Sequence, residues 1–254
     1  MVAFMKRCLL MVLCFFCLVT RGQEHPGRLP AFAEGERLFA EGSYQLASKV
    51  YESVSVDDFS NDPEIQTWIT FRLLDCEWRA LAGSRQVDST VSDKIWLEFG
   101  NLLNQFEAFD AHADFYQLRA TMLESAGDFW WVTRNRRSWP KAWGHYEKAL
   151  KLWAASPDVE IARERYLAIV WKASHPPEVN LNYTYGRYDN YLPASILENA
   201  IKIAVSSVEK SHANFLLAVS LQRQLNQSPY MHERVVRAFN AATAGKIKHA
   251  WMDD

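Results

Sequence analysis

Apolar and polar positions alternate with a helical period along almost the whole chain after Pro30. Apolar side chains recur three and four residues apart, as they do on the buried face of an amphipathic helix. No strand-like alternation of useful length occurs, and only 10 of the 254 residues are glycine. We therefore predict an all-α protein of about ten helices joined by short turns.

The predicted helices have ordinary lengths and recognisable start signals. Asp62-Pro63 is one such signal, because Asp caps free backbone amides and Pro suits the first helical turn. The next helix face includes Cys76, which we interpret as a small buried residue. The predicted ranges are 31–41, 44–56, 62–81, 92–106, 115–133, 139–153 and 209–224, with further helices opening at Ser156-Pro157, Pro193 and Ser228-Pro229.

The stretch "EGSYQLASKVYESV" at 41–54 has the spacing of the second half of a tetratricopeptide-type helical hairpin. Gly42 stands in the tight connection, where a left-handed backbone costs little. Small residues at such positions let two helices approach closely, while aromatic residues fill the gap to the next hairpin. The positions that carry the pattern are Tyr44, Ala47, Tyr51 and Val54.

The same spacing returns further along the chain. Its second occurrence is Trp139, Ala142, Tyr146 and Ala149, and a weaker one is Leu197, Ala200 and Ala204. Ala47 and Ala142 are 95 positions apart (142 − 47), which is not a multiple of the ~34-residue repeat. We therefore expect diverged, tetratricopeptide-like antiparallel hairpins, which form a right-handed α-solenoid over 30–254 rather than a regular array.

The first 22 residues have the character of an export signal. Lys6 and Arg7 precede an apolar run at 8–19, and small residues follow at a possible cleavage site. Twelve apolar residues are too few for the ~20 that span a bilayer, although a retained membrane anchor is the alternative. We expect an exported chain, periplasmic or extracellular, with a signal peptide at 1–22.

Loss of this segment changes the cysteine count and the charge. Cys76 remains alone, so no internal disulfide is expected. Three of the 28 basic residues leave, and 25 basic against 30 acidic residues give a net charge of about −5. That charge, together with the absence of any recognised motif in the sequence, argues against a nucleic-acid surface.

The segment at 174–192 breaks the helical pattern. His175-Pro176-Pro177 ends the preceding helix, because a residue before Pro is pushed out of helical geometry. Tyr-rich loops on rigid scaffolds are common contact surfaces. The alternative is that the loop folds back and closes the end of a hairpin. The candidate partner-binding residues are Tyr183, Tyr185, Arg187, Tyr188 and Tyr191.

Three other clusters of reactive or charged residues are candidate sites. Asp110, His112 and Asp114 are close enough to bind a metal, although a helix-capping turn explains them as well. The basic run at 134–139 fits either an anionic partner or a solvated turn. Glu124-Ser125 is similar to the glutamate-serine pair of lytic transglycosylases, but the glycine-rich sequence expected after it is missing.

Several phrases resemble the N-terminal helical region of very large bacterial alpha-2-macroglobulin-like proteins. They are "RLFAEGSYQLASKVYESV", "WITFRLLDCEWRA", "ESAGDFWWVTRNRRSWPKAWGHYEKALKLW", "ARERYLAIVWKASHPP" and "LENAIKIA". The resemblance implies a signal peptide, helical repeats and then β-sandwich domains that entrap proteases. Neither a bait segment nor a Cys-x-Glu-Gln thioester motif is present, and Cys76 is followed by Glu77-Trp78-Arg79. We therefore expect a truncated or split relative without protease trapping.

These observations predict a non-catalytic scaffold that holds a protein or peptide, or docks the missing macroglobulin domains. Such repeats bind through shape and exposed side chains and need no cofactor or metal. Four aromatic residues are candidates for the binding groove, although core packing explains each of them as well: Trp78, Trp130, Trp131 and Trp143. The competing prediction is a cell-wall enzyme of lytic-transglycosylase type that uses Glu124 as its acid.

Overall fold

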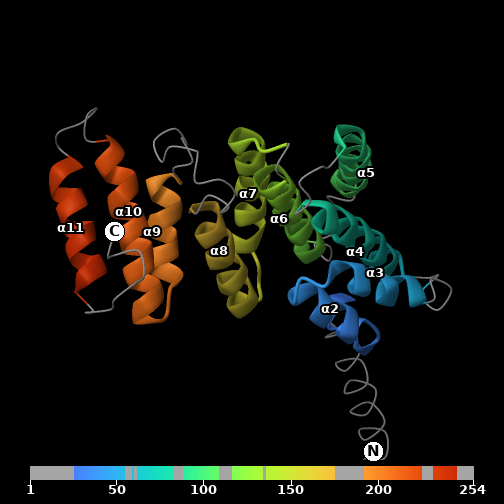
Figure 1. The fold of residues 1–254 in the computed structure, drawn as a ribbon. Coiled ribbons are helices and arrows are strands. Elements are labelled where there is room, and N and C mark those ends of the chain that lie inside the picture. Colours follow the sequence, from blue (N-terminus) through green and yellow to red (C-terminus); the bar gives the residue numbers. More distant parts are fainter. Residues whose placement is uncertain are drawn as a thin grey trace, which may run out of the picture. The chain divides into compact units, whose positions relative to one another are not determined.

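The computed structural model describes residues 26–54, 59, 62–82, 88–108, 116–133, 136–174, 192–224 and 231–244. Within these ranges the chain forms ten α-helices and two short 3-10 helices, with no strand (Figure 1). This confirms the all-α prediction. None of the helices in the described ranges combines the length and apolar character needed to cross a membrane.

The helices lie close to the predicted ranges. Their bounds are Pro26–Arg28 (η1), Pro30–Phe32 (η2), Ala33–Ala40 (α2), Tyr44–Ser53 (α3), Pro63–Ala82 (α4), Ser89–Ala108 (α5), Tyr116–Val132 (α6), Trp139–Ala154 (α7), Val159–Ser174 (α8), Ala194–Ile203 (α9), Ser207–Gln224 (α10) and His232–Thr243 (α11). The predicted start at Asp62-Pro63 is confirmed, because the Asp62 carboxylate accepts hydrogen bonds of 3.1 Å from the amides of Glu64 and Ile65.

One predicted start signal was misplaced. Helix α8 begins at Val159, after Ser156-Pro157, and its first turn is capped by Asp158, whose carboxylate accepts a 3.2 Å hydrogen bond from the Ile161 amide. Asp158, which directly follows Pro157, is the better capping residue there. The predicted start at Ser228-Pro229 lies outside the described residues, and α11 is described from His232.

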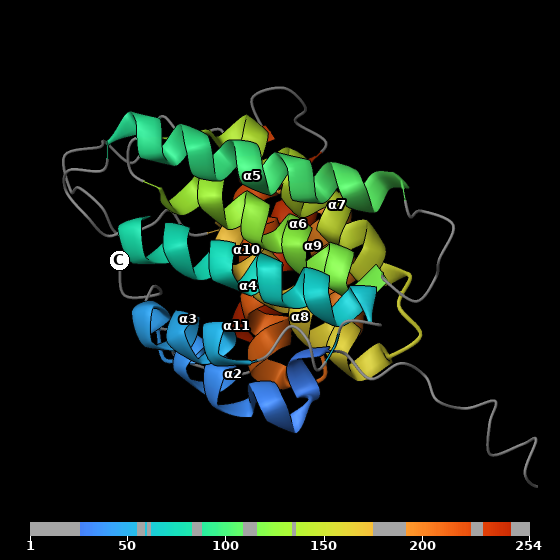
Figure 2. The same cartoon turned by 90° about the vertical axis from the view of Figure 1, so that its right-hand side faces the viewer.

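The chain divides into two compact units, one comprising residues 1–80 and 98–118 and the other residues 81–97 and 119–254. In the first unit α2 packs against α3, as Figure 2 also shows, and the ring of Phe71 contacts the ring of Phe99. In the second unit successive helices from α7 to α11 pack in chain order. Short connections between packed neighbours make α7 and α8, and likewise α9 and α10, antiparallel pairs.

The first hairpin turns at Gly42, whose φ of 79° is left-handed as predicted. The amide of Ser43 donates to the Leu38 carbonyl at 2.9 Å, and the amide of Gly42 donates to the Phe39 carbonyl at 3.0 Å. These bonds satisfy carbonyl groups that the end of α2 would otherwise leave without partners. The chain therefore reverses within three residues and starts α3.

The same close contact between a glycine and a tyrosine occurs in each of two helical hairpins. A Cβ on Gly35 of α2 would lie 2.9 Å from the ring of Tyr51 on α3, and a Cβ on Gly127 of α6 would clash with the ring of Tyr146 on α7. Both tyrosines are fully buried, as are the small residues that precede each by four positions, Ala47 and Ala142. The repeated spacing seen in the sequence therefore corresponds to a repeated packing arrangement.

Candidate functional site

The predicted partner-binding loop lies outside the described residues, and so do all five of its candidate residues, Tyr183, Tyr185, Arg187, Tyr188 and Tyr191. The structure describes only the flanks of this loop, at Ser174 and Leu192. The acidic and histidine cluster at 110–114 also lies outside them, and so do the export signal and Arg134. Within the part of the chain that is described, no three metal-ligating side chains come together.

The four candidate groove tryptophans differ in their surroundings. Trp78 and Trp131 are 2% exposed and belong to the core, as the alternative interpretation of these residues predicted. The guanidinium of Arg79 covers the Trp78 ring at 4.3 Å, and the ring of Trp131 contacts the ring of Trp139 at 4.9 Å. Trp143 is half-buried, and Trp130 lines a pocket described below.

The basic run between α6 and α7 contacts its own chain. Arg136 pairs with Asp93 at 2.6 Å and donates to the Ser89 carbonyl at 2.8 Å. Arg137 donates to the Trp131 carbonyl at 3.0 Å. These two arginines therefore hold the connection between two helices, which favours a structural turn over an anion-binding surface.

Glu124 forms ion pairs with two cationic side chains. It is 5% exposed on α6, and its carboxylate accepts hydrogen bonds from Lys172 at 2.6 Å and Arg165 at 2.8 Å, both on α8. The Glu124 carboxylate therefore connects α6 to α8 through two ion pairs.

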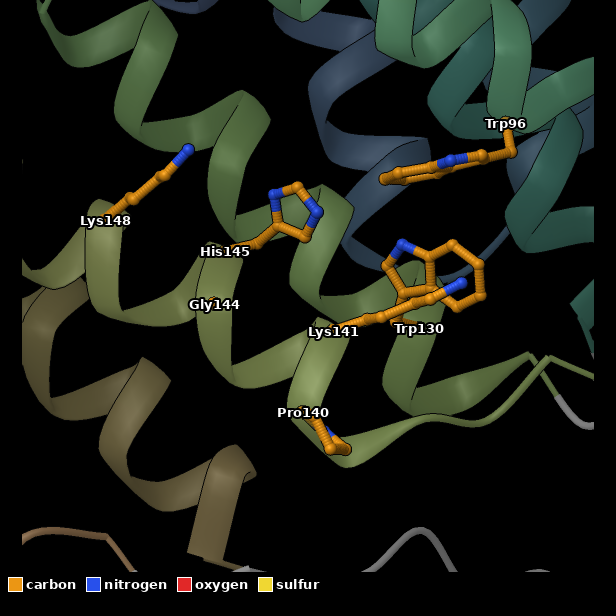
Figure 3. A pocket seen from close by; sticks show the side chains of 7 residues that line it. All are labelled: Trp96, Trp130, Pro140, Lys141, Gly144, His145 and Lys148. Atoms are coloured by element: carbon orange, nitrogen blue, oxygen red, sulfur yellow. The ribbon is translucent and has the colours of Figure 1, made fainter.

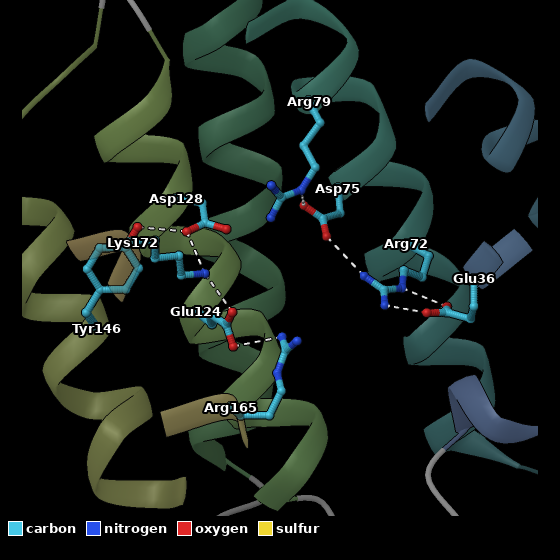
Figure 4. Close-up of polar contacts among 9 residues, drawn as sticks. All are labelled: Glu36, Arg72, Asp75, Arg79, Glu124, Asp128, Tyr146, Arg165 and Lys172. Atoms are coloured by element: carbon cyan, nitrogen blue, oxygen red, sulfur yellow. Dashed lines mark hydrogen bonds and ion pairs between the residues drawn. The ribbon is translucent and has the colours of Figure 1, made fainter. Parts of the chain in front are cut away.

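The first unit contains a cluster of largely buried charged side chains (Figure 4), which we call the Arg72 cluster. Arg72 of α4 pairs with Glu36 of α2 at 2.6 Å and with Asp75 at 3.2 Å. Tyr51 of α3 donates a 2.7 Å hydrogen bond to the same Glu36. Arg79 completes the cluster through Asp75 at 2.8 Å. One acid thus joins three successive helices.

The second unit repeats this arrangement in what we call the Lys172 cluster (Figure 4). Asp128 of α6 accepts a 2.7 Å hydrogen bond from Tyr146 of α7 and pairs with Lys172 of α8 at 2.9 Å. In both clusters the acid directly follows the glycine on which the tyrosine ring packs. The order is the same in each case, with glycine and acid on one helix, tyrosine on the next and a cation on the third.

Burial shifts the pKa of two groups beside the Arg72 cluster. Removal from water raises the pKa of the Tyr51 hydroxyl far above its ordinary value. Burial, and then the neighbouring charge of Asp75, raises the pKa of the Cys76 thiol to about 12. Cys76 is 1% exposed, which confirms the prediction that it is a buried residue. At neutral pH its thiol is protonated, so it is a poor nucleophile.

The second unit also has a pocket of about 320 Å³ (Figure 3). Trp96 of α5 and Trp130 of α6 form its aromatic wall, with ring centroids 4.8 Å apart in an edge-to-face arrangement. The remaining lining residues all lie on α7: Pro140, Lys141, Gly144, His145 and Lys148. Gly144 contributes no side chain, and a Cβ placed on it would meet no atom within 4 Å.

Polar atoms of the pocket lie next to its rings. The Lys141 ammonium lies 3.9 Å from the centroid of the Trp130 ring, a cation–π contact. The His145 ring contacts the Trp96 ring at 5.5 Å. Burial, and then the charge of Lys148, lowers the pKa of His145 to about 4, so this ring is neutral at pH 7. Two cationic side chains and one neutral imidazole therefore surround the aromatic wall.

Two buried nitrogen atoms of this pocket have no hydrogen-bond partner within the described ranges, Nε1 of Trp130 and Nδ1 of His145. The sequence analysis did not combine these residues into a site. A signal was present, since Lys141, His145 and Lys148 recur three and four positions apart. They form the polar face of α7, opposite the buried Ala142, Tyr146 and Ala149.

Comparisons of this chain with protein-family models, with curated proteins and with solved structures give no match.

Proposed function

We propose that this protein is a non-catalytic, exported helical-repeat scaffold for protein-protein interaction. In this proposal, tetratricopeptide-like hairpins form a right-handed α-solenoid behind an N-terminal signal peptide. The chain would then be similar to the N-terminal helical part of bacterial alpha-2-macroglobulin-like protease inhibitors, without their bait and thioester regions. It acts in the periplasm or outside the cell, where it holds a protein or peptide partner.

The observation that carries this proposal is the repeated three-helix arrangement. The Arg72 cluster and the Lys172 cluster each link a glycine-acid pair, a tyrosine and a cation on successive helices. Repeat proteins are built from such copies, because one hairpin cannot bury its apolar face without its neighbour. The two copies support a repeat architecture, and repeat architectures commonly present extended binding surfaces.

The placement of the ionisable residues supports a binding role over a catalytic one. Glu124, Asp128 and Asp75 are each at most 6% exposed, and each is bound to a cation on the same or another helix. The thiol of Cys76 is buried and protonated at neutral pH. In the described part of the chain, these groups stabilise helix packing, and none of them is presented to a substrate.

The loop between α8 and α9 is the proposed contact region for the partner. It connects helices that pack against each other, so its ends are held by a rigid support. Tyrosine supplies contact area and a hydroxyl at low conformational cost. We assign the partner contact to Tyr183, Tyr185, Arg187, Tyr188 and Tyr191.

Affinity capture from the exported fraction of the host tests this proposal. We expect the full chain to retain a discrete protein partner and a chain lacking 180–190 to lose it, with the same melting temperature. Peptidoglycan turnover by the purified chain that Glu124→Gln abolishes would contradict the scaffold and favour the lytic-transglycosylase alternative.

A further inference from the structure

The pocket formed by α5, α6 and α7 has recognition chemistry that the helical packing does not use. Its aromatic wall consists of Trp96 and Trp130, and Gly144 leaves space at its α7 side. Lys141 and Lys148 supply positive charge at its edge. No acidic residue is among the seven that line it. The pocket is therefore apolar on one side and cationic on the other.

The indole of Trp130 provides the most specific feature of this pocket. The residue is only 6% exposed, and its Nε1 atom has no acceptor within the described ranges. Figure 3 shows this nitrogen on the edge of the ring that faces His145 and Trp96. An indole N–H donates and never accepts, so only an acceptor atom can satisfy it. A buried donor without an acceptor is unfavourable.

The neighbouring charge decides which acceptor fits. The Lys141 ammonium lies 3.9 Å from the centroid of the same indole ring, and no acidic partner for it is present in the described residues. A carboxylate accepts a hydrogen bond from an N–H group and pairs with an ammonium at the same time, and such charge-assisted bonds are stronger than neutral ones. A neutral carbonyl would satisfy the indole and leave the ammonium group unpaired.

The volume limits how much of a ligand enters. About 320 Å³ is near the lower end of the ~300–1,000 Å³ typical of small-molecule sites. This space accommodates one or two side chains. Trp96 and Pro140 offer apolar contact to the methylene groups or to an aromatic neighbour of the carboxylate.

We propose that this pocket binds a side-chain carboxylate from an acidic, aromatic-containing segment of the partner protein, with Trp130 Nε1 donating to it and Lys141 pairing with it. This inference rests on the proposed scaffold function and names the chemistry of its partner. The partner segment carries Asp or Glu beside an apolar residue.

A nuclear magnetic resonance titration of the full chain with labelled indole nitrogens tests the assignment. The probe is the peptide acetyl-Phe-Asp-Glu-Phe-amide, and its control is acetyl-Phe-Asn-Gln-Phe-amide. The Trp130 indole resonance is identified by its loss in Trp130→Phe. We expect the acidic peptide to shift this resonance and to bind about tenfold or more tightly than the amide peptide, as expected for a charge-assisted hydrogen bond. Equal shifts with both peptides, or with inorganic phosphate, would overturn the assignment.

Two matched glycine variants show whether a loss of peptide binding comes from filling the pocket or from unfolding the chain. Gly144→Leu fills the open space beside the indole, whereas Gly100→Leu places the same side chain at another helical glycine where a Cβ meets nothing within 4 Å. We expect Gly144→Leu to weaken peptide binding at least tenfold and Gly100→Leu to leave it unchanged, with both chains folded. Unchanged binding by a folded Gly144→Leu chain would also overturn the assignment.

The two proposals fail in different ways. If the chain captures a partner that Gly144→Leu still binds, the scaffold function stands and the pocket assignment fails. If the acidic peptide binds in the pocket but the full chain retains no partner protein, the pocket assignment stands and the proposed function fails.

Discussion

The ring of Tyr146 lies so close to Gly127 that a Cβ on the glycine would overlap with two ring carbons. Both residues are buried, and the tyrosine hydroxyl is fixed by its 2.7 Å hydrogen bond to Asp128. The ring therefore has little freedom to move aside. Glycine at this position is required by the approach of α7 to α6.

Gly127→Ala should destabilise the protein by about 1–3 kcal/mol, the usual effect of forcing an added methyl group into a packed core. Gly144→Ala is the matched control, because its Cβ enters open space on α7. That control should stabilise the helix by roughly 0.5–1 kcal/mol, since alanine loses less entropy than glycine. Urea denaturation measures the change in unfolding free energy for both variants. Equal changes would contradict the close packing of Tyr146 on Gly127.

Arg72→Met should cost more stability than Lys172→Met. The Arg72 side chain is 9% exposed, and its loss leaves Glu36 without its cationic partner, which costs about 3–5 kcal/mol, whereas Asp75 keeps its pair with Arg79. Lys172 is 31% exposed, and Arg165 still pairs with Glu124 when it is removed, so about 1–2 kcal/mol is expected there.

Thermal and urea unfolding of Arg72→Met and of Lys172→Met measure how much stability each substitution removes. The double variant Glu36→Gln, Arg72→Met should recover part of the stability that Arg72→Met loses, because the unpaired acid is removed as well. A double variant no more stable than Arg72→Met would show that the Arg72 cluster does not act as a paired unit.

The His145 ring should make stability depend on pH below 6.5. Its folded pKa of about 4 lies below the ordinary 6.5, so between these values the unfolded chain binds a proton that the folded chain does not. Stability is therefore complete above pH 6.5 and falls as the pH drops toward 4. At ~1.4 kcal/mol per pKa unit, His145 contributes up to roughly 3 kcal/mol of this loss.

Paired denaturation series of the unaltered chain and of His145→Phe between pH 4 and 7 isolate this contribution. Phenylalanine nearly keeps the volume of the His145 ring but has no group that titrates. The difference in unfolding free energy between the two chains should change with pH in this window. A difference that stays constant would contradict the assignment of this pH dependence to His145.

Cys76 should not react with thiol reagents in the folded protein. It is 1% exposed, and burial raises its pKa to about 12, so both access and thiolate formation are suppressed. The test uses a chain in which Cys8, Cys14 and Cys17 are replaced by Ser. We expect one thiol to react with a disulfide reagent in denaturant and none without it. Rapid labelling under native conditions would contradict this.

The helical architecture was predictable from the sequence because it depends on local signals. The period of apolar residues, Gly42 and the cap at Asp62 act within a few positions of each other. The start of α8 was harder to predict, because Ser156, Pro157 and Asp158 are all suited to a helix start and the cap at Asp158 decides between them.

The buried charges and the pocket were beyond the sequence analysis because they depend on contacts between distant residues. Arg72 and Glu36 are 36 positions apart, and Lys172 and Glu124 are 48 positions apart. On a single helix such charges resemble a solvated face. The sequence indicates Trp130 as an aromatic residue, but only the positions of Trp96 and of α7 show that it lines a pocket.

The most direct test of the scaffold function is affinity capture with the full chain and with the chain lacking 180–190, compared on the same exported fraction. We expect a discrete partner protein that the full chain retains in a fixed ratio and the deleted chain loses, at equal melting temperatures. The scaffold function is contradicted if both chains retain the same proteins to the same extent, or if neither retains any.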